Sequence, residues 1–321
     1  MNQKNKKNIA ILMGGESVER KISIKSGEHF CANLNSNEYN SYKILITEKS
    51  EWILRIKDEF YQINKSNFSF KLKNEIIKFD VAIVLIHGEP AENGELSKYF
   101  DSLNIPYNCC DEKASLLTFN KFNCNNFLRK ENFNVPESNT SILEMQKIKF
   151  PCIVKPTTSG SSFGVSKVNS KEQLNQAIEH ARKYSNQYII EEFISGRELC
   201  CAVHDIEKNQ LTTLPITEII SENEIFDYNA KYLGQSKEIT PANINTDLKK
   251  EIEKISEKAY LKLKLKGIVR FDFIIKDKKP YIIEVNTIPG FSKESIVPQM
   301  IKSSNQKISD FISKLLNNIL R

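Results

Sequence analysis

The sequence lacks the features that mark membrane-spanning and exported proteins. No apolar stretch approaches the roughly 20 residues that a membrane-spanning helix requires. The longest continuous apolar run, Val81–Ile86, has the length of a strand. The first residues lead directly into a strand, without the apolar segment and small-residue cleavage site of a signal peptide. We therefore expect a cytoplasmic protein that does not associate with membranes.

Histidine is scarce, and the cysteines are not spaced as metal or disulfide sites usually are. The four histidines are scattered along the chain, which argues against a histidine-based metal centre. The seven cysteines are odd in number, and none belongs to a Cys-x-x-Cys pair. The neighbouring pairs Cys109–Cys110 and Cys200–Cys201 would form disulfides only with strain. We expect reduced, mostly buried thiols.

The charge balance gives little support for a nucleic-acid-binding protein. Lys and Arg number 46 against 40 Asp and Glu, so the net charge is +6 over 321 residues. This small excess hints at an anionic ligand. The one basic run, KNKK at 4–7, is interpreted as a solvated tail, and basic residues are not interleaved with aromatic ones. The hydrophobic fraction of 40% is enough for the two or three cores that this length predicts.

The first hundred residues alternate between strand and helix patterns. Helical spacing covers Ile22–Leu34, and strands are predicted at Asn8–Met13, Tyr42–Ile46 and Val81–Ile86. The last of these is continuously apolar, as in a parallel strand covered on both faces. We therefore predict an α/β domain with a doubly wound parallel sheet and ligand-binding loops at the strand ends. Two such loops are GGESVER (14–20) and HGEPAENG (87–94), although Gly14-Gly15 alone equally fits a tight turn.

The rest of the chain has mixed helix and strand patterns. The predicted helices are Lys113–Asn120, Lys121–Glu131, Lys171–Tyr184, Asp247–Leu263 and Ser309–Leu320. The predicted strands are Pro151–Lys155, Val165–Val168, Tyr188–Glu192, Glu198–Val203, Leu211–Ile220 and the hairpin Gly267–Lys276 with Pro280–Asn286. The polar stretch Ser221–Asn245 has little periodicity and is too long for a simple connection, so it is interpreted as a lid.

The hairpin carries polar residues at alternating positions. Arg270 and Asp272 share one face of the first strand, and Glu284 and Asn286 share one face of the second. A loop centred on Lys278 would place Asp272 opposite Glu284 and Arg270 opposite Asn286. Facing carboxylates repel unless a cation lies between them, and these hard oxygen donors suit Mg²⁺ with substrate phosphates. A solvent-facing hairpin fits this pattern equally well.

The loop from Lys155 to Gly164 is rich in glycine and hydroxyl residues and follows a predicted strand. Its backbone N–H groups and hydroxyls are suited to cradle a phosphate, with Lys155 supplying charge. It is not a Walker-type loop, because the lysine precedes the glycines. A flexible turn accounts for the loop alone equally well, but its occurrence together with the paired carboxylates favours a nucleotide site.

Taken together, these motifs resemble the D-alanine–D-alanine ligases, a family of ATP-grasp enzymes. The resemblance spans most of the chain, with the motifs in the family's order. They are GGESVER (14–20), HGEPAENG (87–94), VKPTTSGSSFGVSKV (154–168), IIEEFISGRE (189–198), FDYNAKY (226–232), VRFDF (269–273) and EVNTIPGFSKESIVP (284–298). The family fold implies an N-terminal α/β domain at 1–109 and two α+β domains, at 110–194 and 195–321, that sandwich ATP.

The resemblance implies a reaction in which ATP drives the joining of two D-alanines through an acyl phosphate. The product, D-alanyl-D-alanine, would serve peptidoglycan synthesis and hence cell shape. The implied ATP-binding residues are Lys121, Lys155, Ser161, Ser162, Glu191, Glu192, Phe193, Ile194, Glu198 and, in the lid, Lys231. The implied metal ligands, for two Mg²⁺ with Mn²⁺ as a substitute, are Asp272, Glu284 and Asn286. The implied quaternary structure is a homodimer.

The resemblance also implies roles around the reacting carbonyl. Substrate would be bound by Glu19, His87, Ser295 and Ile296, and the catalytic residues would be Glu19, Ser161, Tyr232, Arg270 and Gly290. Glu19 would bind the ammonium of the first D-alanine, while Arg270 and the Gly290 N–H would stabilise the oxyanion of the second step. Ser295 and the Ile296 backbone would hold the second carboxylate. Tyr232 favours D-alanine over D-lactate as second substrate.

The chain departs from the family pattern in the loop at 87–94. Ala91 and Asn93 stand where the family has glycine and aspartate, and alanine at 91 is costly only if that residue requires a positive φ. Two alternatives remain: a ligase with a different second substrate, which the pocket around Glu19, Tyr232 and Ser295 would distinguish, and an ATP-binding regulator without catalysis. The regulator is disfavoured because Arg270 and the carboxylates are intact.

Overall fold

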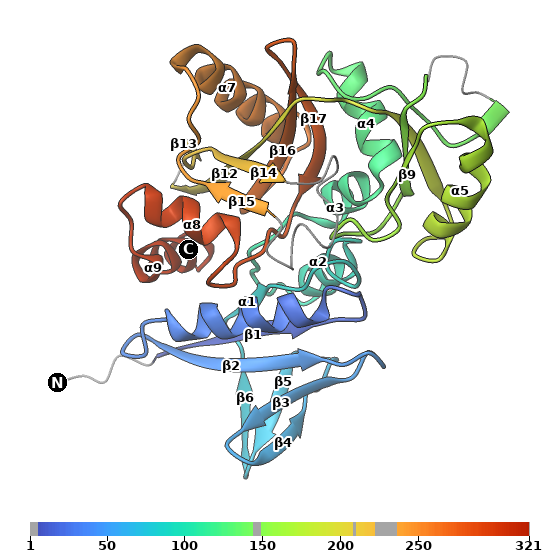
Figure 1. Cartoon of the computed structure of the whole chain (residues 1–321). Coiled ribbons are helices and arrows are strands. Elements are labelled where there is room, and N and C mark those ends of the chain that lie inside the picture. The colour runs from blue at the N-terminus through green and yellow to red at the C-terminus, as the bar shows by residue number, and fades with distance from the viewer. Residues whose placement is uncertain (1–5, 144–148, 208–209, 222–235, 321) are drawn as a thin grey trace.

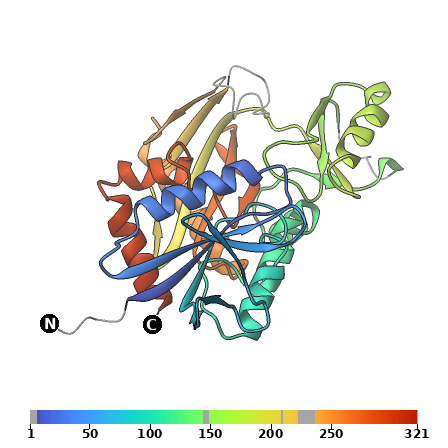
Figure 2. The same cartoon turned by 90° about the horizontal axis from the view of Figure 1, so that it is seen from below.

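The computed structural model describes residues 6–143, 149–207, 210–221 and 236–320. Three larger β-sheets follow one another along the chain, and helices pack against them (Figure 1). The sheet that carries α5 projects to one side of the other two, as the second view shows (Figure 2). Lys231, Tyr232 and most of the predicted lid lie outside the described residues. Among the described helices, none is long and apolar enough to cross a membrane.

The first sheet has the order β4-β3-β2-β1-β7. Its strands are β1 (Lys7–Gly14), β2 (Tyr39–Ile46), β3 (Trp52–Ile56), β4 (Glu59–Gln62) and β7 (Val81–Val84). β1 pairs parallel with both β2 and β7, and β3 and β4 extend the sheet antiparallel. A separate hairpin consists of β5 (Ser69–Leu72) and β6 (Glu75–Lys78). β7 is buried along its whole length, as its continuous apolar sequence predicts.

Helices cover both faces of this parallel core. α1 (Arg20–Ala32) places Phe30 in a cluster with Ile9 and Ile11 of β1, whereas α2 (Glu95–Ser102) places Phe100 in the cluster of Ala10 and Leu12 on the other face. Alternate residues of one strand therefore serve two cores. This is the doubly wound arrangement expected from the sequence, with β3 and β4 added at one edge.

The central part of the chain contains two short helices and a four-stranded sheet. α3 (Glu112–Phe119) and α4 (Lys121–Lys130) are each started by a side-chain cap, since Asp111 accepts from the Ala114 N–H and Asn120 from the Asn123 N–H. The sheet has the order β10-β9-β11-β8. Its elements are β8 (Ser138–Asn139), β9 (Cys152–Pro156), β10 (Ser166–Val168), β11 (Tyr188–Glu192), a short 3-10 helix (Lys171–Gln173) and α5 (Leu174–Arg182).

The third sheet has the order β15-β14-β12-β16-β17, with β13 paired to β12. Its strands are β12 (Arg197–Glu207), β13 (Gln210–Thr213), β14 (Thr217–Ser221), β15 (Ser236–Ile239), β16 (Ile268–Lys276) and β17 (Lys279–Asn286). Its helices are α7 (Thr246–Lys262), α8 (Ile296–Ser303) and α9 (Ile308–Ile319). Two predictions were wrong here: Leu211–Ile220 forms two strands, and part of the expected irregular lid, Ser236–Ile239, is a sheet-edge strand.

The predicted pairing of the β16–β17 hairpin is confirmed, but by a different route. The turn has two residues, Asp277 and Lys278, both with positive φ, so it is not centred on Lys278. The register shifts by one beyond Phe273, at a β-bulge. This shift compensates for the shorter turn. As a result, Asp272 still pairs with Glu284 and Arg270 with Asn286.

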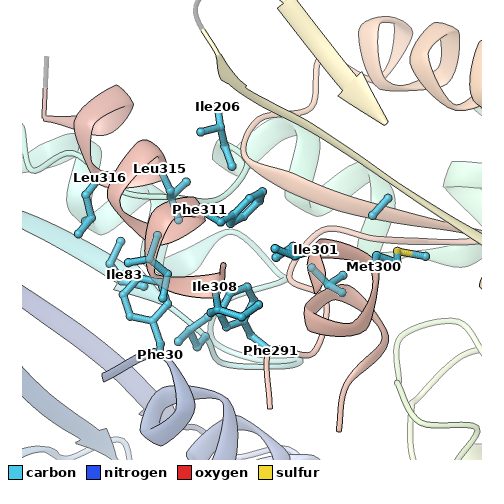
Figure 3. Close-up of a cluster of buried hydrophobic side chains, with 14 of the residues drawn as sticks. Phe30, Ile83, Ile206, Phe291, Met300, Ile301, Ile308, Phe311, Leu315 and Leu316 are labelled. Atoms are coloured by element: carbon cyan, nitrogen blue, oxygen red, sulfur yellow. The ribbon is translucent and has the colours of Figure 1, made fainter. Parts of the chain in front are cut away.

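One hydrophobic cluster joins the first and third sheets through the C-terminal helices (Figure 3). Phe30 of α1 and Ile83 of β7 contribute from the first sheet, Ile206 from β12, and Phe311 and Leu315 from α9. Each of these side chains is at most 4% exposed, and burial of each is worth about 1.5–3 kcal/mol. The two sheets are therefore held together across a shared core, which fixes the relative position of their ligand-facing loops.

Candidate active site

Two adjoining cavities lie where the three sheets meet. The first cavity, of about 350 Å³, is lined by Glu19, His87, Arg270, Asn286, Gly290, Ser295 and Ile296 among others. The second cavity, of about 390 Å³, is lined by Lys155, Ser162, residues 191–198 and Asp272 among others. Lys121, Ser159, Gly160, Ile283 and Glu284 line both. A ligand bound across these shared residues would reach both cavities.

The β16–β17 hairpin forms the wall between the cavities. Arg270 donates two hydrogen bonds to Asp272, from Nε to Oδ1 at 2.7 Å and from Nη2 to Oδ2 at 2.8 Å, and Asn286 Nδ2 donates to the same Oδ2 at 2.9 Å. Burial alone would lower the pKa of Arg270. The ion pair with Asp272 outweighs that effect and holds the pKa above its ordinary value, so Arg270 stays charged beside the first cavity.

Two lysines extend this pairing of opposite charges. Lys121 Nζ lies 3.1 Å from Glu284 Oε1 and donates to the Ser159 carbonyl at 2.6 Å. Lys155 Nζ lies 2.7 Å from Glu191 Oε2, with both side chains less than a tenth exposed. When no ligand is bound, a neighbouring carboxylate neutralises the charge of each lysine. Each is also close enough to a cavity to meet an anionic ligand that competes for it.

Asn125 completes the buried Lys155–Glu191 pair. Its Nδ2 donates to Glu191 Oε1 at 2.8 Å, so both oxygens of the carboxylate are satisfied. Asn125 lies one turn after Lys121 on α4. Asn125 was not among the predicted site residues, although its spacing of four from Lys121 on a capped helix indicates a shared face.

The donor set of the hairpin fits a hard divalent cation. Asp272 and Glu284 are directly opposed across the β16–β17 pair, and Asn286 adds an amide oxygen. Within the described residues, no group of three or more His, Cys, Asp or Glu side chains is arranged to hold a metal. Two carboxylates and one amide leave open coordination positions. Such a set suits Mg²⁺ with further ligands from a bound phosphate.

The loop between β9 and β10 reaches across to the N-terminal part of the chain. Ser161 and Ser162 both have positive φ, at 48° and 59°, a conformation that L-residues rarely adopt. The Ser161 hydroxyl donates to the Glu19 carboxylate. A Cβ added at Gly160 would collide with that carboxylate, so a larger residue there would displace the Glu19 side chain. The loop is thereby held against the start of α1, over both cavities.

His87 presents one ring nitrogen to the first cavity. Its Nδ1 lies 2.8 Å from the Ile288 carbonyl, which only accepts, so Nδ1 carries the hydrogen. Burial lowers the pKa of His87, which favours the neutral ring. Its buried Nε2 has no hydrogen-bond partner among the described residues, so an acceptor lone pair is left for a donor in the cavity.

The loop before α8 forms the opposite end of the first cavity. Ser295 precedes the first turn of α8, and its Oγ accepts from the Ser292 N–H at 3.0 Å. A Cβ added at Gly290 would lie 2.8 Å from this Oγ. The adjacent Ile296 begins the helix, where unpaired backbone N–H groups favour anions. This end of the cavity is suited to a carboxylate.

The second cavity combines an apolar slot with polar edges. Phe193, Ile194, Ile153 and Ile274 contribute apolar surface. Lys167 Nζ lies 4.3 Å from the centre of the Phe193 ring. The segment at 191–198 runs from the second sheet into the third, and these sheets lie side by side (Figure 1). A slot of this kind fits a flat heteroaromatic ring with a polar tail.

The loop at 87–94 tolerates its departures from the family pattern. Gly88 and Gly94 have positive φ, but Ala91 and Asn93 do not, so alanine at 91 carries no backbone strain. Glu92 lines the first cavity and accepts from the Gly88 N–H at 2.7 Å. Burial, reinforced by Glu19, raises its pKa to about 7.

Every predicted site residue that the structure describes lines one of the two cavities or both. Two other predicted site residues, Lys231 and Tyr232, lie outside the described residues. Beyond the predicted set, the cavities also include Glu238, Arg197 and Glu218. Arg197 Nε donates to Glu218 Oε1 at 2.7 Å and Nη2 to Oε2 at 2.9 Å. Glu238 went unnoticed because its strand appeared irregular in the sequence.

Comparisons with known proteins agree on one family. The chain matches the family models for the D-ala D-ala ligase N-terminus at residues 8–110 and the D-ala D-ala ligase C-terminus at residues 118–317. It is 42% identical to a D-alanine--D-alanine ligase from Azobacteroides pseudotrichonymphae, covering 98% of this chain and 100% of the relative. It is 40% identical to one from Flavobacterium johnsoniae, covering 97% of this chain and 98% of the relative.

Solved structures extend the likeness to the whole fold. The VanG D-Ala:D-Ser ligase from Enterococcus faecalis is 30% identical with a TM-score of 0.88, covering 98% of this chain and 100% of that one. A D-alanine--D-alanine ligase from Bacillus anthracis is 29% identical with a TM-score of 0.78, covering 98% of each chain.

Proposed function

The chain belongs to the D-alanine–D-alanine ligase family, with the ATP-grasp fold, and on this basis we propose how its two cavities divide one reaction. The protein is an ATP-dependent ligase that joins two D-alanines into D-alanyl-D-alanine for peptidoglycan synthesis. The observation that carries the proposal is the Arg270–Asp272–Glu284 wall, which lies between the first cavity and the second cavity with its aromatic and aliphatic slot. ATP binds on one side of this wall and the amino acids on the other.

The second cavity receives ATP. Phe193 and Ile194 line the adenine slot, and the backbone at 192–194 supplies hydrogen bonds to the base. Glu191 and Glu198 serve the adenine and ribose. Ser161 and Ser162 contribute hydroxyl groups to the ATP site. Lys121, Lys155 and Lys231 bind the phosphates. Since Lys121 and Lys155 are paired with carboxylates, ATP competes with internal partners for both.

Asp272, Glu284 and Asn286 would hold two Mg²⁺, for which Mn²⁺ would substitute. The metal would supply positive charge to the phosphates of the transferred group. Asp272 is the residue that changes partners most, because both its oxygens accept from Arg270 or Asn286. We propose that nucleotide and metal bind together, because the positive charge of the metal and the negative charge of the phosphates offset each other.

The first chemical step takes place at the junction of the cavities. Glu19 binds the ammonium of the first D-alanine, while Ser161 holds Glu19 in place. His87 offers its Nε2 lone pair to the same substrate. A carboxylate oxygen of this D-alanine attacks the γ-phosphorus of ATP, which gives an acyl phosphate and ADP. Phosphorylation is needed because a free carboxylate is a poor acyl donor.

In the second step, the amine of the second D-alanine attacks the acyl phosphate. The resulting oxyanion is stabilised by Arg270 and the Gly290 N–H, while Ser295 and the Ile296 backbone hold the second carboxylate. Tyr232 is proposed to connect the lid to Ser161 and Glu19. Exclusion of water by that lid would protect the acyl phosphate from hydrolysis.

We retain the division into an N-terminal domain at 1–109, a central domain at 110–194 and a C-terminal domain at 195–321. Each proposed domain contains one of the three larger sheets, which supports the division. A cytoplasmic location and a homodimer are further proposals drawn from the family resemblance. Apart from a second copy of the chain, the proposed binding partners are small-molecule substrates.

Purified protein with ATP and Mg²⁺ tests the proposed substrates directly. Phosphate release is expected only when D-alanine is present, and neither D-serine nor D-lactate alone should replace it. Mixtures of D-alanine with each of these compounds distinguish the alternative second substrate, which matters because a D-Ala:D-Ser ligase shares the fold. Faster phosphate release with D-serine, together with a mixed product, would overturn the assignment of D-alanine to the second site.

A further inference from the structure

Glu238 is a carboxylate of the first cavity to which the reaction above assigns no role. It lies on the edge strand β15 and lines the cavity together with Arg270, Gly290 and Ser295. Its neighbour Lys237 is exposed and lines neither cavity, as expected from the alternation of side chains along a strand. The strand therefore turns one acidic side chain toward the proposed site of the second D-alanine.

A hydrogen bond fixes this carboxylate beside α8. Gln299 Nε2 donates to Glu238 Oε2 at 2.5 Å and to the Glu294 carbonyl at 2.8 Å. Gln299 lies one helical turn after Ser295, and its N–H donates to the Ser295 carbonyl at 3.3 Å. Glu238 is thus held within about one turn of the residue proposed to bind the second carboxylate.

This spacing matches the chemistry of an α-amino acid. The carboxylate carbon and the ammonium nitrogen are bonded to the same α-carbon, so the groups that recognise them must be close neighbours. We propose that Glu238 binds the ammonium group of the second D-alanine and accepts one of its protons before attack. This inference rests on the proposed function and adds to it a proton acceptor for the second step.

The other carboxylates of the first cavity have different positions and different hydrogen-bond partners. Glu19 accepts from the Ser161 hydroxyl at the opposite end, beside the phosphate loop. Glu92 accepts from the Gly88 N–H and is influenced by Lys121 and Glu284, on the side of the nucleotide. Glu294 is exposed. Of the two cavity carboxylates on the α8 side, Glu238 is the less exposed.

The charges around Glu238 suit a proton acceptor. Burial raises its pKa, while the Gln299 hydrogen bond and the nearby Arg270 charge act in the opposite direction. A carboxylate with a raised pKa is a stronger base than one in water. The Gln299 hydrogen bond and the Arg270 charge favour the ionised carboxylate, which attracts an ammonium group.

The step balances in atoms and charge. The ammonium gives one proton to the Glu238 carboxylate and becomes a neutral amine. The nitrogen lone pair forms the C–N bond at the acyl carbon, and the bond from that carbon to the phosphate oxygen breaks. The second proton leaves the nitrogen with the departing phosphate, which becomes hydrogen phosphate. Glu238 then returns its proton to water after the dipeptide leaves.

The test compares two nucleophiles in wild-type protein and in the Glu238→Gln variant. Glutamine keeps an oxygen for the Gln299 hydrogen bond but cannot accept a proton. The second D-alanine must lose a proton before attack, whereas hydroxylamine is largely uncharged near neutral pH and needs no base. We expect kcat/KM for dipeptide formation to fall about 100-fold or more. Formation of D-alanine hydroxamate with ATP should stay within about twofold of wild type, because it bypasses this base.

The pH profile supplies the second readout. In the variant, dipeptide formation should rise with pH as more of the free amine is present, so that the deficit narrows in alkaline solution. Lys237→Gln is the matched control, since it removes a charge from the adjacent, outward-facing position. It should behave as wild type with both nucleophiles.

The outcomes separate the role of Glu238 from the proposed function. If wild-type protein makes neither product, the proposed function fails. An unchanged rate of dipeptide formation in Glu238→Gln would overturn the inference alone. Equal losses of dipeptide and hydroxamate would also overturn it, because they would indicate general damage to the site. A selective loss of dipeptide with an unaltered pH profile would refute proton acceptance.

Discussion

Replacing His204 with phenylalanine should stabilise the protein, and more strongly in acid than at neutral pH. His204 lies on β12, is 3% exposed, and packs edge-on against Phe311 of α9 with ring centres 5.2 Å apart. Neither ring nitrogen has a hydrogen-bond partner among the described residues. Burial lowers the pKa of His204 to about 4, with smaller effects of Glu207, which raises it, and Lys314, which lowers it.

The size of the effect follows from proton linkage. The unfolded chain takes up a proton at His204 near pH 6.5, but the folded chain does so only near pH 4. Between these values the unfolded state binds more protons, so the His204 contribution to stability falls as the pH falls. Two pKa values about 2.5 apart correspond to about 3 kcal/mol. Phenylalanine has no such proton and avoids the loss.

Denaturant titrations of both proteins at several pH values provide the measurement. The stability difference, variant minus wild type, should already favour phenylalanine at pH 7, by about 1–3 kcal/mol, because unpaired buried polar groups are removed. It should grow by up to about 3 kcal/mol on lowering the pH to 4. Taking the difference cancels titrating groups common to both proteins. A difference that does not change with pH would refute the reasoning.

Three further predictions concern the two cavities. Arg270→Ala should abolish dipeptide formation while nucleotide still binds, measured by steady-state kinetics and calorimetry; an unimpaired rate would contradict its role at the oxyanion. Glu191→Gln should cost about 3–5 kcal/mol in unfolding free energy, because the buried Lys155 charge loses its partner, and a thermal shift within error of wild type would argue against this. Gly160→Ala should raise KM for D-alanine, since the added Cβ meets the Glu19 carboxylate; the exposed change Lys49→Ala serves as its control.

The hairpin shows how far local patterning determines the site. Alternation of polar and apolar residues predicted which side chains share a face of each strand, because the pleat imposes a period of two. Pairing Asp272 with Glu284 also required an assumed turn. The turn type and the bulge escaped prediction, since each depends on backbone conformations of a few residues. Their effects on register cancel at Asp272. The correct pairing therefore rested on an incorrect turn.

Elements determined by tertiary contacts were harder to predict. The short strands β3 to β6 were not predicted. Their role becomes clear only in the folded structure, where Trp52 of β3 and Phe70 of β5 belong to one hydrophobic cluster with Phe68. β15 was hidden for a similar reason, because it is a short edge strand stabilised by pairing with β14. Since Glu238 lies on that strand, its place in the cavity could not be predicted either.

The charge pairing within the site also depends on the fold. Lys121 and Lys155 were both identified from the sequence, but their carboxylate partners Glu284 and Glu191 come from distant segments of the chain. Spacing in the sequence cannot reveal such partners. Their presence gives the positive charge of the site a second role, since it balances the carboxylates when no nucleotide is bound.

The stoichiometry of the purified wild-type protein tests the central claim most directly. With ATP, Mg²⁺ and D-alanine as the sole amino acid, the products can be measured together by mass spectrometry and a phosphate assay. We expect one D-alanyl-D-alanine, one ADP and one phosphate for each turnover. Phosphate formed without dipeptide, or dipeptide formed without consumption of ATP, would contradict it.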